Sequence, residues 1–108
     1  MALSHAAPAD VISVFRGGED FSRFSSIALA KTESMELIRM VLPKGKAMPE
    51  HHVPGEITLL CLEGEIAVDV HGTTRTLHAG DILYLLGGQA HSLRAEQDTL
   101  ALLTILLE

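Results

Sequence analysis

The sequence predicts a single all-β domain, built as a sandwich or barrel of short strands. Short apolar or alternating runs are separated by glycines at regular intervals, as at Gly64, Gly72 and Gly80. No long segment carries the 3.6-residue periodicity of an amphipathic helix. A chain of 108 residues is long enough for one domain and too short for two of ordinary size.

The chain begins with a segment that has no periodicity. Residues 1–10 are rich in alanine, so we expect a loose N-terminal tail, with the barrel formed by residues 11–108. Residues 11–15 are apolar enough for a short edge strand, which the pair Gly17–Gly18 would end.

Two strands follow, over residues 25–30 and 34–42. Alternation in the second places Ile38, Met40 and Leu42 on one face. Prolines and glycines then predict that residues 44–55 are irregular.

Further strands are expected over residues 57–62, 65–71, 73–77 and 82–86, each bounded by glycine. Side chains alternate along a strand, so Ile57, Leu59 and Cys61 share the interior face.

The last segment, residues 99–107, fits either a helix or a strand. Leucines at 100, 103 and 107 suit a helix, whereas Thr99, Thr104 and Ile105 favour a strand, which we prefer. A nearly unbroken apolar run implies burial on both faces. In so small a barrel one face of this strand has no second layer of the same chain to cover it. The simplest cover is the other subunit of a dimer.

Composition excludes several classes of function. The net charge is −6 and the eight basic residues are scattered, which argues against a nucleic-acid surface. No apolar run reaches the ~20 residues needed to span a bilayer, and the N-terminus does not look like a secretory signal. A single cysteine allows no intrachain disulfide. We therefore expect a cytoplasmic protein that binds neither nucleic acid nor membrane.

Two spaced motifs in residues 45–95 carry a resemblance. Gly45, His51 and Gly64 match the form G-x5-H-x-H-x(3,4)-E-x6-G, with Val53 at its second histidine position and Ile57 at its glutamate position. Further on, the form G-x5-P-x-G-x2-H-x3-N is matched at the glycine and histidine positions: Gly80, Gly88 and His91. Leu86 and Ala95 replace its proline and asparagine.

In these two motifs the chain resembles the cupin superfamily, and above all the small single-domain cupins of bacteria. The resemblance implies a double-stranded β-helix, a jelly-roll-like barrel that is usually dimeric, with a pocket inside. In metal-binding cupins this pocket holds a transition metal on three histidines and a glutamate. By family register, His51 and His91 point inward, while an isoleucine at position 57 removes one ligand and its negative charge.

A second register is open at the first motif. If the loop shifts by one residue, Glu50 and His52 take the paired positions and join His91 as two histidines and a carboxylate, which suits a divalent ion. The sequence leaves open which of the two neighbouring histidines faces the barrel. It also leaves open whether Fe, Mn, Zn or Ni is bound or none, since two inward histidines are one ligand short of an ordinary site.

The sequence is compatible with two functions for the barrel. The first is a binder of a small molecule in the barrel, with a degenerate metal site; its pocket residues would be His51, His52, Ile57, Leu59, Cys61, Tyr84 and His91. The alternative is a metal-dependent dioxygenase or isomerase whose ligands come from Glu50, His51, His52 and His91. Either would be a homodimer, so the sequence does not decide whether the protein is an enzyme.

Overall fold

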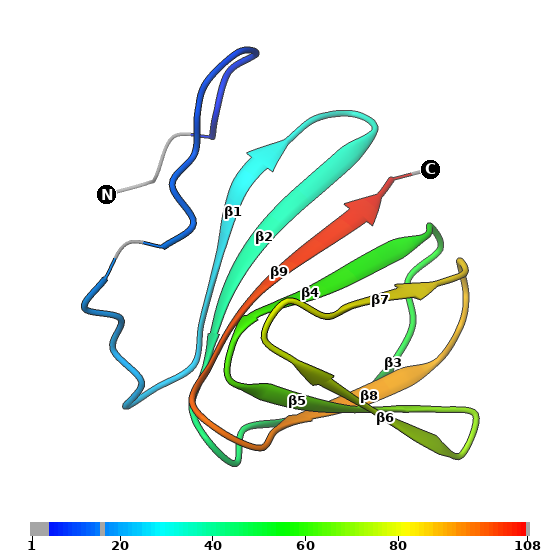
Figure 1. Ribbon diagram of the computed structural model, residues 1–108. Helices are drawn as coiled ribbons and strands as arrows, with labels where there is room; N and C mark the ends of the chain where they lie inside the picture. Colours follow the sequence, from blue (N-terminus) through cyan, green and yellow to red (C-terminus); the bar gives the residue numbers. More distant parts are fainter. Residues whose placement is uncertain (1–4, 16, 108) are drawn as a thin grey trace.

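The computed structural model, which describes residues 5–15 and 17–107, is all-β and folds as the predicted jelly-roll-like barrel. Two antiparallel sheets are stacked face to face (Figure 1). Among the described residues no helix has the length and apolarity needed to cross a bilayer.

The larger sheet has the strand order β1-β2-β9-β4-β7. Its strands are β1 (Ser25–Lys31), β2 (Met35–Leu42), β9 (Thr99–Leu106), β4 (Ile57–Glu63) and β7 (Ile82–Leu85). The smaller sheet has the order β3-β8-β5-β6. Its strands are β3 (Ala47–His51), β8 (His91–Ala95), β5 (Glu65–Val70) and β6 (Thr73–His78).

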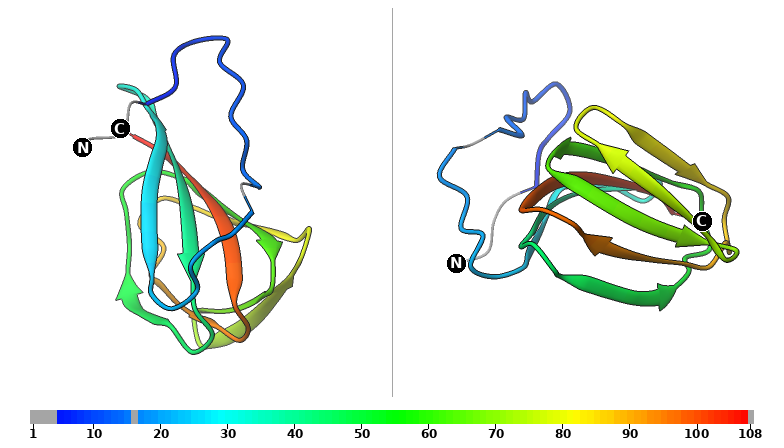
Figure 2. Two further views of the ribbon diagram at one scale, coloured as in Figure 1. Left: turned by 90° about the vertical axis from the view of Figure 1, so that its left-hand side faces the viewer. Right: turned by 60° about the horizontal axis from the view of Figure 1, so that its bottom comes forward.

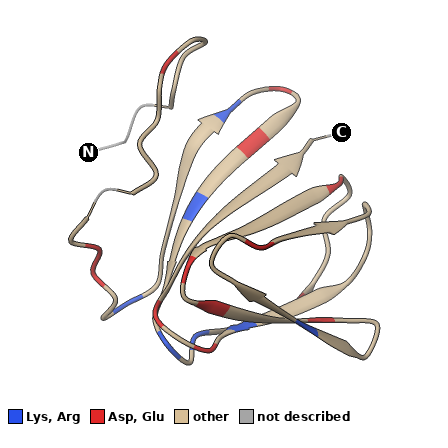
Figure 3. Ribbon diagram, in the orientation of Figure 1, with Lys and Arg blue, Asp and Glu red and all other residues tan. Residues whose placement is uncertain are grey.

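The C-terminal segment is a strand, β9, and lies in the middle of the larger sheet. It pairs with β2 along one edge and with β4 along the other. Its sequence TLALLTIL contains no charged residue, and the strand is drawn entirely in tan in Figure 3. The inward face of the strand packs in the core through Ala101 and Leu103, whereas its outward face carries apolar residues such as Leu106, which is 45% exposed.

Two sequence predictions of local structure are wrong. Residues 11–15 do not form an edge strand; they belong to a segment without regular structure that runs outside β1 (Figure 2). Residues 44–55 are not irregular throughout, because β3 forms there and pairs with β8. Pro49 is tolerated because β3 is an edge strand with a register shift, so its missing N–H costs no ladder hydrogen bond.

The N-terminal segment is attached to the outer face of β1 and β2. The Ala6 N–H donates to the carbonyl of Leu29, at 2.8 Å. Arg39 points outward from β2, yet only 5% of it is exposed, because it donates from Nε to the Val14 carbonyl and pairs with Glu19. The predicted tail therefore makes at least one backbone contact with the barrel; residues 1–4 lie outside the described residues.

The interior has two ends that differ in packing. At what we call the packed end, four apolar side chains of the core have no exposed surface: Leu42, Cys61, Ile66 and Ala101. The opposite end, which we call the open end, is formed by His51, Ile57, Leu85, His91 and Leu103, which line a cavity.

Gly64 makes the link between the sheets at the packed end. It is the single residue between β4 and β5, and its φ of +92° lies in the left-handed region that favours glycine. A Cβ here would lie 2.4 Å from the carbonyl oxygen of Asp98. The sharp turn brings Glu65 next to Thr99, whose buried hydroxyl donates to the Gln97 carbonyl and accepts from the Glu65 N–H.

Candidate functional site

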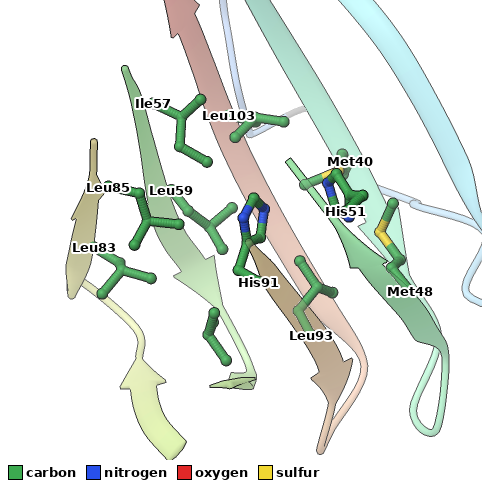
Figure 4. Close-up of a pocket in the computed structure, with 11 residues that line it drawn as sticks. Met40, Met48, His51, Ile57, Leu59, Leu83, Leu85, His91, Leu93 and Leu103 are labelled. Carbon is green, nitrogen blue, oxygen red and sulfur yellow. The ribbon is translucent and has the colours of Figure 1, made fainter. Parts of the chain in front are cut away.

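The candidate site is the cavity between the two sheets at the open end. The cavity has a volume of about 30 Å³, and the whole space between its lining side chains, open solvent included, is about 380 Å³. The wall is formed mainly by aliphatic side chains of both sheets: Ile57, Leu59, Leu83, Leu85, Leu93 and Leu103. Figure 4 shows these side chains around two imidazole rings.

A β-bulge decides which histidine of the first motif faces this cavity. Met48 on β3 is opposite Leu93, and His51 is opposite His91, so one extra residue lies between the two pairs. Met48 and His51 therefore share the inward face although they are three residues apart. Without the bulge, strict alternation from Met48 would place Glu50 and His52 inward.

The two inward histidines lie side by side at the mouth. Their ring centroids are 4.4 Å apart, and the ring planes are tilted by 57°. His51 is exposed, whereas only 5% of His91 is accessible. One ring is thus open to solvent and the other forms part of the wall.

Both rings use the same nitrogen to hold their orientation. His51 donates from Nδ1 to the carbonyl of Pro49 at 3.0 Å, and His91 donates from Nδ1 to the carbonyl of Gln89 at 3.1 Å. A carbonyl oxygen can only accept, so each neutral ring carries its hydrogen on Nδ1 and keeps a lone pair on Nε2. The pair consequently offers two acceptor nitrogens that no backbone group uses.

The apolar surroundings disfavour a charge on His91. Burial in the aliphatic wall is the largest cause that lowers the pKa of its imidazole below 6.5, and the neighbouring His51 acts in the same direction. The hydrogen bond to the Gln89 carbonyl opposes this shift. At neutral pH the ring is therefore uncharged.

Four of the seven residues expected in the pocket line the cavity: His51, Ile57, Leu59 and His91. Cys61 shares their face of β4 but is fully buried in the core, deeper than the lining. Tyr84 points outward from β7, with 55% exposed. His52 is exposed, and Glu50 lies in a shallow surface depression beside Ser92 and Arg94.

Met40, Met48, Leu83 and Leu85 also line the cavity but were not among the predicted pocket residues. The signal for Met40 was present, because alternation on β2 puts it on the face of Ile38 and Leu42. The same alternation on β7 places Leu83 and Leu85 inward. Met48 had no such signal, because the bulge that follows it breaks the alternation with His51.

The donors at the cavity do not fit the metal centre of three histidines and a glutamate that the motifs imply. Within the described part of the chain, no group of three or more His, Cys, Asp or Glu side chains is placed to hold an ion. Ile57 occupies the glutamate position and contributes only hydrocarbon to the wall. A divalent ion would meet two imidazoles and no anionic ligand here.

Comparisons with known proteins agree with this architecture. Residues 38–107 match the profile of a family described as the cupin domain. None of the curated proteins matches the chain.

Solved structures share the fold. A conserved protein of unknown function from Streptococcus pyogenes superposes with a TM-score of 0.84 at 18% identity, over 100% of this chain and 96% of that one. A cupin superfamily protein from Desulfitobacterium hafniense gives 0.83 at 16% identity, over 100% and 99%. An RmlC-like cupin protein from Desulfovibrio desulfuricans gives 0.72 at 25% identity, over 98% and 97%.

Proposed function

Because the chain belongs to the cupin family, we propose that it is a binding protein for a small, mainly apolar molecule, held at the open end of the barrel. One observation carries the proposal: two imidazole acceptors stand together at the mouth of an otherwise aliphatic cavity. Sites of this kind use apolar walls for affinity and a few polar groups for orientation.

The chemistry of the pair defines the ligand. Both Nε2 atoms accept hydrogen bonds, so a ligand that donates from a hydroxyl or N–H group is favoured over one that only accepts. An anionic group is not favoured, because the lining contains no Lys or Arg and His91 is neutral. We therefore infer an aliphatic or aromatic alcohol, or an amine in its neutral form.

The size of the cavity limits how the ligand enters. A cavity volume of about 30 Å³ has room for about one or two water molecules, so a larger apolar group must displace side chains. Met40 and Met48 are suited to this, because an unbranched thioether side chain changes rotamer at low cost. The body of the ligand would enter past the methionines while its donor group stays at the histidines.

A matched pair of probes tests the proposal. Titration with phenol and with benzene, followed by ¹H–¹⁵N NMR of backbone and histidine ring nitrogens, should show phenol binding more tightly and shifting the His51 and His91 signals. His91→Phe should remove the preference, whereas Tyr84→Phe on the outer face should retain it. If neither probe binds, or if the shifts map outside the cavity, the proposal fails.

We also propose that the protein is a homodimer through the uncovered half of the larger sheet. The N-terminal segment covers the outer face at β2, but β9, β4 and β7 present apolar side chains there, with Ile82 61%, Tyr84 55% and Leu106 45% exposed. Register places Ile82 in one row with Leu60 and Leu102. A second copy of the chain would bury this surface.

Sedimentation equilibrium tests the homodimer. We expect a dimer for the native protein and a monomer for Ile82→Glu, with Ser26→Glu on β1 as a control that stays dimeric. A monomeric native protein at tens of micromolar would contradict the proposal.

A further inference from the structure

A groove lies on the side of the barrel, between the edge strands of the two sheets. β6 is the last strand of the smaller sheet, and β7 is the last strand of the larger one. The groove has a volume of about 300 Å³, at the lower end of the range for small-molecule sites. Leu83 and Leu85 of β7 line both this groove and the cavity at the open end, so they lie between the two spaces.

Arg75 occupies an inward position on β6. Its partner across the strand pair is Val68 of β5, a core residue with no exposed surface. Residues directly opposite each other in an antiparallel pair lie on the same face of the sheet, so Arg75 shares the inward face with Val68. Leu77, two residues further along β6, also belongs to the core. Arg75 is nevertheless exposed, because the space beside it is the groove.

The guanidinium of Arg75 differs from those of the other described arginines in having no carboxylate partner. The others form three ion pairs: Arg23 with Asp20, Arg39 with Glu19 and Arg94 with Glu96. Within the part of the chain that the structure describes, the side chain of Arg75 makes no ion pair, and no Asp or Glu lines the groove. A planar guanidinium presents paired N–H donors that match the two oxygens of a carboxylate. This wall of the groove therefore suits an anion.

The opposite wall contributes a second donor and an apolar surface. Gln89 lies in the loop after β7, and its side-chain oxygen accepts a hydrogen bond from the Leu86 N–H at 3.1 Å. Because the oxygen is used in this way, the NH₂ group of Gln89 is left to donate to a ligand. Leu83 and Leu85 supply the aliphatic part of the same wall.

From these observations we propose that the groove binds a small organic carboxylate, with its anionic group at Arg75 and its apolar body against Leu83 and Leu85. A monoanion with an apolar body is favoured over phosphate, because the described lining holds one permanent cation and would leave a second negative charge uncompensated. The inference does not rest on the proposed function. The cavity selects a neutral donor through His51 and His91, whereas the groove selects an anion through Arg75.

Arg75 has a second possible role that needs no ligand. An inward-pointing charge on an edge strand discourages that edge from pairing with the edge of another sheet. Such a role requires the charge alone, whereas recognition of a carboxylate also requires the paired donors of the guanidinium and the apolar wall beside it. Ligands that differ in one of these features therefore distinguish the two roles.

Four ligands test the groove in the full chain: benzoate, its neutral isostere nitrobenzene, acetate and inorganic phosphate. Each is titrated and followed by ¹H–¹⁵N NMR of the backbone, the Arg75 Nε–H and the Gln89 side-chain amide. We expect benzoate to bind at least about fivefold more tightly than the other three, because it alone has both the carboxylate and the apolar ring. Its shifts should map to β6, β7 and Gln89 rather than to His51 and His91. Added salt should weaken the binding of benzoate more than that of nitrobenzene.

Substitutions assign the carboxylate to one side chain. Arg75→Gln should lower the affinity for benzoate at least about fivefold, to the level of nitrobenzene. Arg75→Lys keeps the charge but not the paired donors, so it should lose less. Arg94→Gln is the matched control, because it removes the same charge from the outward face of the smaller sheet, where Arg94 is opposite Ala67 and pairs with Glu96. It should bind benzoate as the native protein does.

Three results would overturn the proposal. The first is equal affinity of the native protein for benzoate and nitrobenzene, which would leave Arg75 only its role at the sheet edge. The second is phosphate binding as tightly as benzoate, which would indicate a general anion site. The third is benzoate binding that neither Arg75→Gln nor Arg75→Lys changes, while circular dichroism shows the variants to be folded.

Discussion

The packed end and the open end of the barrel are built from the same strands but differ in what fills them. At the packed end, Leu42 of one sheet and Ile66 of the other belong to one core cluster and have no exposed surface. At the open end, the same pair of sheets leaves a cavity and two histidines. Close packing at the packed end therefore stabilises the fold. The side chains at the open end contribute less to that packing, so they can differ according to the ligand.

Truncating a leucine at each end would measure this difference. Leu42→Ala should lower the free energy of unfolding by about 4 kcal/mol, because the rigid packed end cannot collapse around the space left behind. Leu85→Ala should cost only about 2 kcal/mol, since the cavity beside it is already open and water can enter. Urea denaturation at matched protein concentration measures the unfolding free energy of both variants. Equal losses of stability would contradict the difference in packing between the two ends.

A carboxylate introduced at the open end tests whether a missing acidic ligand is what distinguishes this cavity from the site of metal-binding cupins. Ile57→Glu should lower the stability of the metal-free protein by about 3 kcal/mol, because the acid is placed in an aliphatic wall. The same variant gains a third ligand beside His51 and His91, so millimolar zinc(II) should raise its Tm. Ile57→Gln controls for shape and should show no response to zinc(II). A zinc response in the native protein would contradict our description of its donors.

The hydroxyl of Thr99 is a polar contribution at the packed end. Thr99→Val keeps the shape of the side chain but leaves the Glu65 N–H without its acceptor at the turn between the sheets. We expect a loss of about 1–2 kcal/mol by urea denaturation. Thr58→Val, on the outer face of β4, is the control and should change stability by less.

The smallest effect concerns the pH dependence of the metal-free protein. The pKa of His91 is lowered in the folded state, so between that pKa and about 6.5 the unfolded chain binds more protons. Stability should therefore fall as the pH decreases through 6.5 and become level again below the folded-state pKa. The Tm of His91→Gln should depend less on pH over this interval, whereas exposed His52→Gln should follow the native curve.

Sequence reasoning predicted the packed end well, because simple alternation governs it. Counting in twos along residues 57–62 and 38–42 identified Cys61 and Leu42 as inward at this end. The same count identified Ile57, Leu59, Ile38 and Met40 as inward farther along these strands, and all six are buried or packed against the core. The turn at Gly64 followed from the motif and from the conformations that only glycine adopts freely. Here local pattern and tertiary contacts agree.

The open end was less predictable, for two physical reasons. Prolines around β3 concealed a strand, since they are compatible with an edge position that sequence alone does not reveal. Tyr84 was expected inside, but its neighbours Leu83 and Leu85 take the inward positions of β7. The N-terminal segment was equally hidden, because its attachment depends on a buried arginine of a distant strand.

The bulge in β3 has a consequence for how such barrels diverge. An insertion or deletion of one residue in this strand changes which neighbours share a face, and so can exchange a histidine for its neighbour without substituting either. Two homologues with an identical run of Glu, His and His would then carry different donors. Chain length at this one point, rather than residue identity, would set the chemistry of the interior.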